Sequence, residues 1–171
     1  MNKETSKPHR SKPKQRARQE WLAVLTNSSL ADLEEGLTRL NLEPKYSFLR
    51  RPEVGLVMVR GRAGGNGRRF NLGEMTVSRC TVALADGPTG TGYVAGRSRR
   101  RAELVALFDA LLQDPDRQAL IKAKVIRPLR QRQAETEHLQ SRKTAATKVD
   151  FLTMVRGEDG DAPYRPSSAG L

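Results

Sequence analysis

The spacing of apolar residues changes twice along this chain, and that change constrains the fold more than any other feature. Between Trp21 and Leu40, apolar residues recur every three or four positions, as on one face of a helix. From Tyr46 to Ala95, short valine-rich runs alternate with polar residues and are separated by glycine-rich turns, a pattern typical of strands. After Ser98 the helical spacing returns. Because adjacent strands are flanked by helices, we expect an α+β fold with an antiparallel sheet.

The first half of this pattern predicts a helical hairpin followed by strands. Ser28 or Ser29 offers a hydroxyl that can cap the second helix. The sequence Arg51-Pro52-Glu53 indicates a turn, so residues 45–60 are interpreted as a β-hairpin. A glycine-dense loop is expected at 61–67. The later strands are expected at 75–84 and 93–95.

The second half predicts C-terminal helices and a final extended segment. A broad apolar stripe between Ser98 and Asp114 indicates a well-packed helix, and Pro128 should interrupt or kink the next one. Residues 129–148 favour helix but contain few apolar residues, so this helix is expected to be exposed or to contact a partner. Residues 149–155 are apolar on both alternating faces, as in an extended docking segment.

Charge divides the chain into a body and two tails. The net charge is +12 over 171 residues, and residues 1–18 carry seven basic side chains against one acidic side chain. We therefore expect a disordered basic tail at 1–15, one domain at 16–157 and a disordered tail rich in proline and serine at 158–171. Basic arms often contact nucleic acid, so a basic RNA-binding accessory protein is the alternative function.

Composition also excludes several classes of protein. No apolar run is long enough to cross a membrane and no secretory signal is present, so we expect a cytoplasmic protein. A single cysteine excludes an internal disulfide and sites built on several thiolates. Cys80 lies in an apolar strand pattern and is expected in the core. Glu135 and His138 lack the second pair that a di-iron site needs, so we expect no metal site.

Two glycine patterns nearly match phosphate-binding motifs. Residues 87–92 have the glycine spacing of a P-loop but lack its lysine, and Gly90-Thr91-Gly92 is followed by a strand instead of a helix. A backbone nest near Gly64 and a cluster of arginines before the helix at 99 remain as anion-binding candidates. The alternatives are a mobile turn for the first, and for the second either pairing with acids of a neighbouring subunit or simple solvation. The candidates are Gly64, Gly65, Gly67, Arg68, Arg69, Arg97, Arg99, Arg100 and Arg101.

Several short fragments, taken together in their order and spacing, resemble one known family. They are Arg18-Gln19-x-Trp21, Gly64-Gly65-x-Gly67-x-Arg69-Phe70, Gly73-Glu74-x-Thr76-x-x-Arg79, Asp109-Ala110-Leu111 and Val149-Asp150-Phe151-x-Thr153-Met154-Val155-Arg156-Gly157. From about Arg18 to Gly157 the chain resembles the PhnG family, the G subunit of the bacterial carbon–phosphorus lyase system. The basic arm and the C-terminal tail lie outside the resemblance, so we do not expect nucleic acid as a partner.

The resemblance implies a role within an assembly. In this family the G, H, I and J subunits form a core complex with two copies of each. The G, H and I subunits, together with an L subunit, make ribose 1-methylphosphonate 5-triphosphate from ATP and methylphosphonate, a transferase reaction that releases adenine, and the J subunit acts afterwards. The iron–sulfur cluster and SAM belong to the J subunit, so no cofactor is expected on this chain. No catalytic residue of the G subunit is available to carry over.

Two roles for the chain within such a complex differ in their use of the arginines. In the first, the chain is a scaffold that docks on the I subunit through the helix at 129–148 and the segment after it. In the second, the candidate arginines also bind the triphosphate or the phosphonate. We favour the scaffold because the sequence offers no clear acid–base pair. The partner-docking candidates are Val149, Phe151, Met154, Val155 and Arg156.

Overall fold

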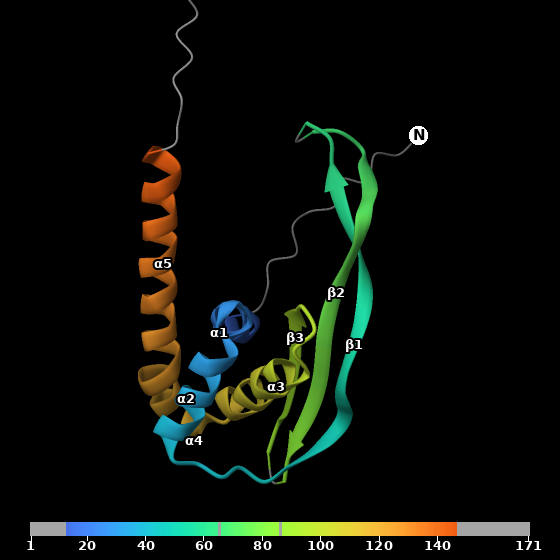
Figure 1. Ribbon diagram of the computed structural model, residues 1–171. Helices are drawn as coiled ribbons and strands as arrows, with labels where there is room; N and C mark the ends of the chain where they lie inside the picture. The colour runs from blue at the N-terminus through green and yellow to red at the C-terminus, as the bar shows by residue number, and fades with distance from the viewer. Residues whose placement is uncertain (1–12, 65, 86, 147–171) are drawn as a thin grey trace, which may run out of the picture.

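The computed structural model describes residues 13–64, 66–85 and 87–146 and has three layers. A sheet of three antiparallel strands in the order β1-β2-β3 forms one layer, a single helix forms the second, and most of the remaining helices cover that helix (Figure 1). The elements are α1 (Pro13–Asn27), α2 (Leu30–Leu40), β1 (Tyr46–Arg62), β2 (Arg69–Leu84), β3 (Thr89–Ala95), α3 (Arg99–Gln113), α4 (Pro115–Ile121), the π-helical turn η1 (Lys122–Ile126) and α5 (Arg127–Ala146). The expected α+β fold, in which helices precede and follow an antiparallel sheet along the chain, is confirmed.

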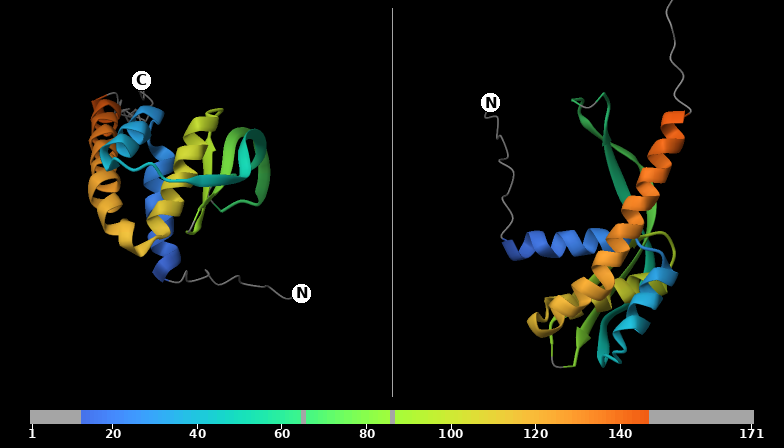
Figure 2. Two further views of the ribbon diagram at one scale, coloured as in Figure 1. Left: turned by 90° about the horizontal axis from the view of Figure 1, so that it is seen from below. Right: turned by 90° about the vertical axis from the view of Figure 1, so that its left-hand side faces the viewer.

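Helix α3 lies at the centre of the molecule. Figure 2 shows it between the sheet and the outer helices, and every residue from Leu104 to Leu112 is buried. An apolar stripe as broad as the one in this sequence suits a helix that is covered on both sides. The hydrophobic core therefore extends from the sheet through α3 to Trp21 and Leu33 of the outer layer.

Two glycines allow β3 to pack directly on the backbone of α3. A Cβ atom added at Gly90 would lie 2.0 Å from the carbonyl oxygen of Ala106, and one at Gly92 would lie 2.0 Å from that of Ala102. No side chain fits there, since real Cβ contacts are not shorter than 3.0 Å. The glycine pattern at 90–92 thus serves close packing, and it lies within β3, which begins four residues before the strand expected at 93–95.

The N-terminal helical hairpin is confirmed. Ser29 is the N-cap of α2, and its hydroxyl accepts a hydrogen bond from the Asp32 amide at 3.1 Å. Asn41 ends the helix in the left-handed conformation, with a φ of 49°. Helix α1 already begins at Pro13, within the range in which the sequence analysis expected a tail, and residues 1–12 lie outside the described part of the chain.

The expected β-hairpin at 45–60 is wrong, because β1 is one long strand that contains a bulge. Arg50 lies opposite Thr81 and Glu53 lies opposite Arg79, so two residues of β1 face only Cys80. One of those two is proline, which lacks the amide hydrogen that a regular ladder needs and is accommodated at bulges. The turn residues in the sequence therefore mark an irregularity within a strand.

Strands β1 and β2 extend well beyond the rest of the sheet. The last pair between β2 and β3 joins Val77 to Ala95, so residues 69–76 of β2 pair with β1 alone. We call the paired segments 56–62 and 69–76 the ribbon; Figure 1 shows that it projects beyond α1 and α3. The loop at its tip corresponds to the expected glycine-dense loop, although Gly61 belongs to β1.

The C-terminal helices include a π-helical turn and end in α5, which projects from one end of the body. The backbone changes to a π-helical turn at Lys122–Ile126, directly before Pro128, whose missing amide hydrogen breaks the regular hydrogen-bond pattern. From Ala134 to Ala145 every side chain of α5 is exposed, and the two views in Figures 1 and 2 show α5 projecting to the same side of the body as the ribbon. The expected extended segment at 149–155 lies outside the described residues.

Candidate functional site

The structure divides the arginine cluster before α3 into engaged and unengaged members. Arg100 donates a hydrogen bond to Glu103 at 2.8 Å and lies 3.8 Å from a carboxylate oxygen of Glu34. Arg101 donates to the carbonyl oxygen of Thr26 in the last turn of α1, so it joins α3 to α1. Arg97 and Arg99 are exposed and, within the described part of the chain, have no ion-pair partner.

The helix N-terminus beside this cluster is already capped. The side chain of Ser98 accepts a hydrogen bond from the Arg101 amide, which satisfies one of the free donors of the first turn. Anion binding here depends mainly on Arg97 and Arg99, the two exposed cations, and it remains a prediction.

The glycine loop forms a tight turn between β1 and β2. The Asn66 amide donates to the carbonyl oxygen of Gly64, and the Gly67 amide donates to that of Ala63. Gly64 has a φ of 59°, and a Cβ atom at Gly67 would lie 2.4 Å from the carbonyl oxygen of Ala63, so both positions require glycine. At least two of the amides of the expected nest are thus used within the turn, while Gly65 lies outside the described residues.

The two groups of anion-binding candidates do not come together. Arg68 and Arg69 are exposed at the tip of the ribbon, whereas Arg97 follows the end of β3, which pairs with Val77. Arg69 lies eight residues from Val77 along β2, which corresponds to about 26 Å of extended strand. One small anion cannot contact both groups in a single chain.

A buried carboxylate forms the most elaborate polar site of the described structure. Asp109 of α3 is 0% exposed, and its Oδ1 accepts hydrogen bonds from Arg18 Nε at 3.0 Å and Trp21 Nε1 at 3.1 Å. Its Oδ2 accepts from Arg18 Nη2 at 2.6 Å, from the amide of Thr91 at 2.9 Å and, more weakly, from Gln113 Nε2 at 3.4 Å. The hydrogen bond to Asp109 raises the pKa of the Arg18 guanidinium, so this side chain stays charged.

This carboxylate joins α1, β3 and α3, and all of its hydrogen-bonding capacity is used inside the chain. A carboxylate held in this way cannot exchange protons with a substrate, so Asp109 is a structural group. Asp109 was not among the site residues expected from the sequence. The available signal was that Arg18, Trp21 and Asp109 all fall in fragments that carry the family resemblance, far apart along the chain.

Polar residues at the start of α5 attach this helix to the N-terminal hairpin. Arg132 donates to Asp32 at 2.5 Å and to Glu35 at 3.0 Å, both on α2. A hydrogen bond from Ser29 and then the contact with Arg132 lower the pKa of Asp32, and Arg132 followed by Arg39 lowers that of Glu35. The polar face of α5 therefore has an intramolecular function near its beginning, and the helix is unsupported only farther along.

Cys80 lies in the core, as expected. It is 0% exposed, and its thiol donates a hydrogen bond to the carbonyl oxygen of Arg50 beside the bulge. Burial, followed by the charge of Glu103, raises the pKa of the thiol to about 11. The protonated, buried thiol is therefore no nucleophile at neutral pH.

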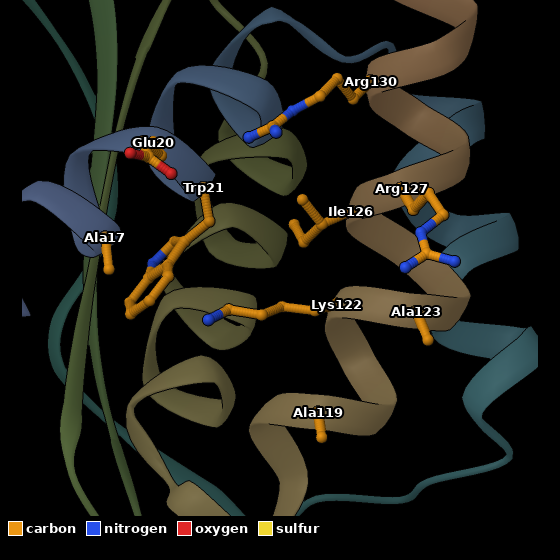
Figure 3. A pocket seen from close by; sticks show the side chains of 9 residues that line it. All are labelled: Ala17, Glu20, Trp21, Ala119, Lys122, Ala123, Ile126, Arg127 and Arg130. Carbon is orange, nitrogen blue, oxygen red and sulfur yellow. The ribbon is translucent and has the colours of Figure 1, made fainter.

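The pocket in Figure 3 lies between α1 and the C-terminal helices and has a volume of about 430 Å³. Lys122 and Arg130 extend toward α1, and the ammonium of Lys122 lies 5.6 Å from the centre of the Trp21 ring. Glu20 is the one acidic side chain that lines it. The pocket is thus cationic, and a single carboxylate does not form an acid–base pair.

Residues 13–64, 66–85 and 87–146 contain neither a metal site nor a membrane-spanning helix. In this part of the chain, no three histidine, cysteine, aspartate or glutamate side chains come close enough to hold a metal ion. No helix there is long and apolar enough to span a membrane. The docking candidates Val149, Phe151, Met154, Val155 and Arg156 lie outside the described residues.

Comparison with known proteins agrees with the fragments identified in the sequence. The family described as phosphonate metabolism protein PhnG matches residues 16–157. Alpha-D-ribose 1-methylphosphonate 5-triphosphate synthase subunit PhnG of Rhizobium meliloti (strain 1021) is 44% identical over 142 residues, which are 83% of this chain and 90% of the relative. The matched region includes every helix and strand described above except the first residues of α1. The chain therefore belongs to the PhnG family of phosphonate metabolism proteins.

Proposed function

We propose that this protein is the G subunit of a carbon–phosphorus lyase complex that forms ribose 1-methylphosphonate 5-triphosphate from ATP and methylphosphonate. The observation that carries this proposal is the 44% identity to a subunit of that synthase, which extends over 83% of the chain. The partners are the H, I and J subunits, two copies of each, and the L subunit takes part in the reaction. ATP with a divalent metal ion is the substrate of the complex, and the iron–sulfur cluster and SAM are held by the J subunit. We place the complex in the cytoplasm.

Within this complex, the chain acts as a scaffold and supplies no catalytic acid or base. Three features of the described residues support this role: the carboxylate of Asp109 is saturated by internal donors, Cys80 is buried and protonated, and Arg100 and Arg101 are held by intrachain contacts. The exposed end of α5 and the segment 149–155 that follows it are the elements that dock on the I subunit. In support of docking, every side chain of α5 from Ala134 to Ala145 is exposed in the described part of the chain.

Replacement of the unengaged arginines distinguishes a scaffold from a subunit that binds the substrate. The complex is assembled from the full-length chain with its H, I, J and L subunits, and adenine release from ATP is measured with methylphosphonate present. The test variant is Arg97→Ala/Arg99→Ala. The matched control is Arg16→Ala/Arg51→Ala, which removes two other exposed arginines.

For a scaffold, both variants assemble and release adenine within about twofold of the wild-type rate, whereas omission of the chain abolishes the reaction. If the arginines neutralise phosphate charge in the transition state, the test variant alone loses activity by about 100-fold or more, since such interactions contribute several kcal/mol. An intact complex with that loss would refute the purely structural role. Repeating the assay with Arg68→Ala/Arg69→Ala examines the other candidate group.

A further inference from the structure

The ribbon exposes apolar side chains on both of its faces. Leu56 is 62% exposed and Leu72 is 65% exposed. Leu56 and Met58 lie on the face that continues the α3-covered side of the sheet, whereas Met75, which pairs with Val57, lies on the opposite face. Isolated two-stranded ribbons are only marginally stable in water, and exposed apolar groups of this kind mark surfaces that another molecule covers.

The tip of the ribbon has an unfavourable concentration of positive charge. Arg62 lies directly opposite Arg69 across the two strands, and Arg60 and Arg68 are close along the chain. Like charges in directly opposite positions destabilise a strand pair. None of these four arginines has an ion-pair partner among the residues that the structure describes, and Glu74 is the one acidic residue of the ribbon. An acidic neighbour would remove this repulsion.

We propose that the ribbon inserts into an apolar groove, flanked by carboxylates, on a different protein subunit of the assembly. This inference rests on the proposed function, because it assigns the contact with a neighbouring subunit to a specific element. The leucine and methionine side chains fill the groove from both faces of the ribbon, and the arginines at the tip pair with the flanking acids. Such charge pairs steer and orient association, while the buried apolar groups supply most of the affinity.

The charge at the tip argues against a second copy of this chain as the occupant. Two ribbons packed together through a twofold axis, with Arg68 of each tip loop, would bring together eight arginines and two glutamates. The composition of the ribbon also favours a protein over a nucleic acid as the occupant: its apolar residues are leucine, valine and methionine, and Phe70 is the one aromatic side chain that could stack on a base. A heterologous protein groove satisfies both the apolar and the cationic groups.

The test uses co-expression of the full-length tagged chain with its H, I and J subunits and quantifies the subunits that co-purify. Leu56→Asp/Leu72→Asp places two charges on the apolar ribbon. The matched control, Leu49→Asp/Leu120→Asp, makes the same change at two exposed leucines outside the ribbon. Circular dichroism and thermal unfolding establish that both variants fold. We expect the ribbon variant to lower the recovery of partner subunits at least tenfold, and the control to stay within twofold of the wild type.

A second variant separates docking from the stability of the chain. Arg62→Glu replaces the repulsion with Arg69 by an attraction, so the isolated chain should be no less stable than the wild type. The same change places a negative charge against the acidic groove, so recovery of the partner subunits should fall at least threefold. A stable Arg62→Glu chain that assembles as well as the wild type would contradict the proposed charge pairing.

Other outcomes overturn the proposal in distinguishable ways. If the wild type recovers the H, I and J subunits and the ribbon variants do so equally, the assignment of the ribbon is wrong and the proposed function stands. If the isolated chain is a dimer that Leu56→Asp/Leu72→Asp dissociates, the occupant is a second copy. If the wild type instead recovers RNA in a salt-sensitive manner that Arg62→Glu weakens, the ribbon is a nucleic-acid surface. If the wild type recovers no subunit at all, both the proposed function and the ribbon assignment fail.

Discussion

Replacement of Asp109 by asparagine tests whether this buried carboxylate holds the three layers together. Asp109→Asn keeps the shape of the side chain but removes its charge and turns one acceptor oxygen into a donor amide. In either orientation of that amide, an N–H group faces other donors: Arg18 Nε and Trp21 Nε1 on one side, or Arg18 Nη2 and the Thr91 amide on the other. At least one buried donor then has no acceptor.

The size of the effect follows from the burial of these partners. A buried donor left without an acceptor costs about 1–3 kcal/mol, and removing one member of a fully buried ion pair costs about 3–5 kcal/mol. The Arg18 side chain is 38% exposed, so water can solvate it again and the ion-pair contribution is discounted. We expect the free energy of unfolding to fall by about 3 kcal/mol, which corresponds to about 10 °C in Tm for a domain of this size.

Urea denaturation of the full-length chain, followed by circular dichroism, measures this change. Asp116→Asn is the matched control, because Asp116 is exposed at the start of α4 and should contribute less than about 1 kcal/mol. Equal stabilities of the two variants would refute the reasoning. The double-mutant cycle with Arg18→Gln adds a second criterion: the two sites should be coupled, since they share two hydrogen bonds.

Three further predictions follow from the packing and from the shifted pKa values. Gly92→Ala should lower the free energy of unfolding by about 2 kcal/mol or more, because its Cβ atom would lie 2.0 Å from a backbone oxygen of α3. Gly73→Ala, with nothing within 4 Å, should change it little, and similar losses in urea denaturation would contradict the packing argument. The Cys80 thiol, with its pKa raised to about 11, should resist a thiol reagent at neutral pH until the protein unfolds, so rapid labelling of the native chain would be inconsistent with its burial. The pKa of Asp32 is lowered, first by Ser29 and then by Arg132, so its stabilising effect is present above its ordinary value of 3.8 and is lost as the pH falls through the lower, folded-state pKa. Arg132→Gln should reduce the loss of stability measured in urea between about pH 5 and pH 2.5, and an unchanged pH dependence would exclude this ion pair as its source.

Local patterns in the sequence were sufficient for the helices and for the positions of β2 and β3, although both strands begin earlier than expected. Helical spacing of leucines and a serine cap define α2, and these signals act within one or two turns of the chain. The bulge in β1 was not predictable in the same way. Proline and charged neighbours at 51–53 occur both in turns and in bulges, and only the pairing of Glu53 with Arg79 on β2 decides between them.

The polar sites also combine features that were visible in the sequence with features that only the tertiary structure shows. The arginine cluster near 99 was visible as a run in the sequence, but its separation into engaged and exposed members depends on Glu34 and Thr26, which are distant in the chain. Asp109 was hidden for a related reason: an acid on an apolar helix gives no local sign of the donors that will surround it. Trp21 and Thr91 approach it only when α1 and β3 pack on α3.

The sequence by itself determined the fold class, the caps and the family, because periodicity, capping and ordered fragments are properties of neighbouring residues. The tertiary structure decided which polar groups are used inside the chain and which surfaces remain uncovered. Burial and hydrogen bonding depend on contacts between distant segments. The carboxylate of Asp109 is saturated because other elements enclose α3, and the apolar ribbon is exposed because β2 extends beyond the end of β3. Those two features support, respectively, the scaffold role and the proposed docking surface.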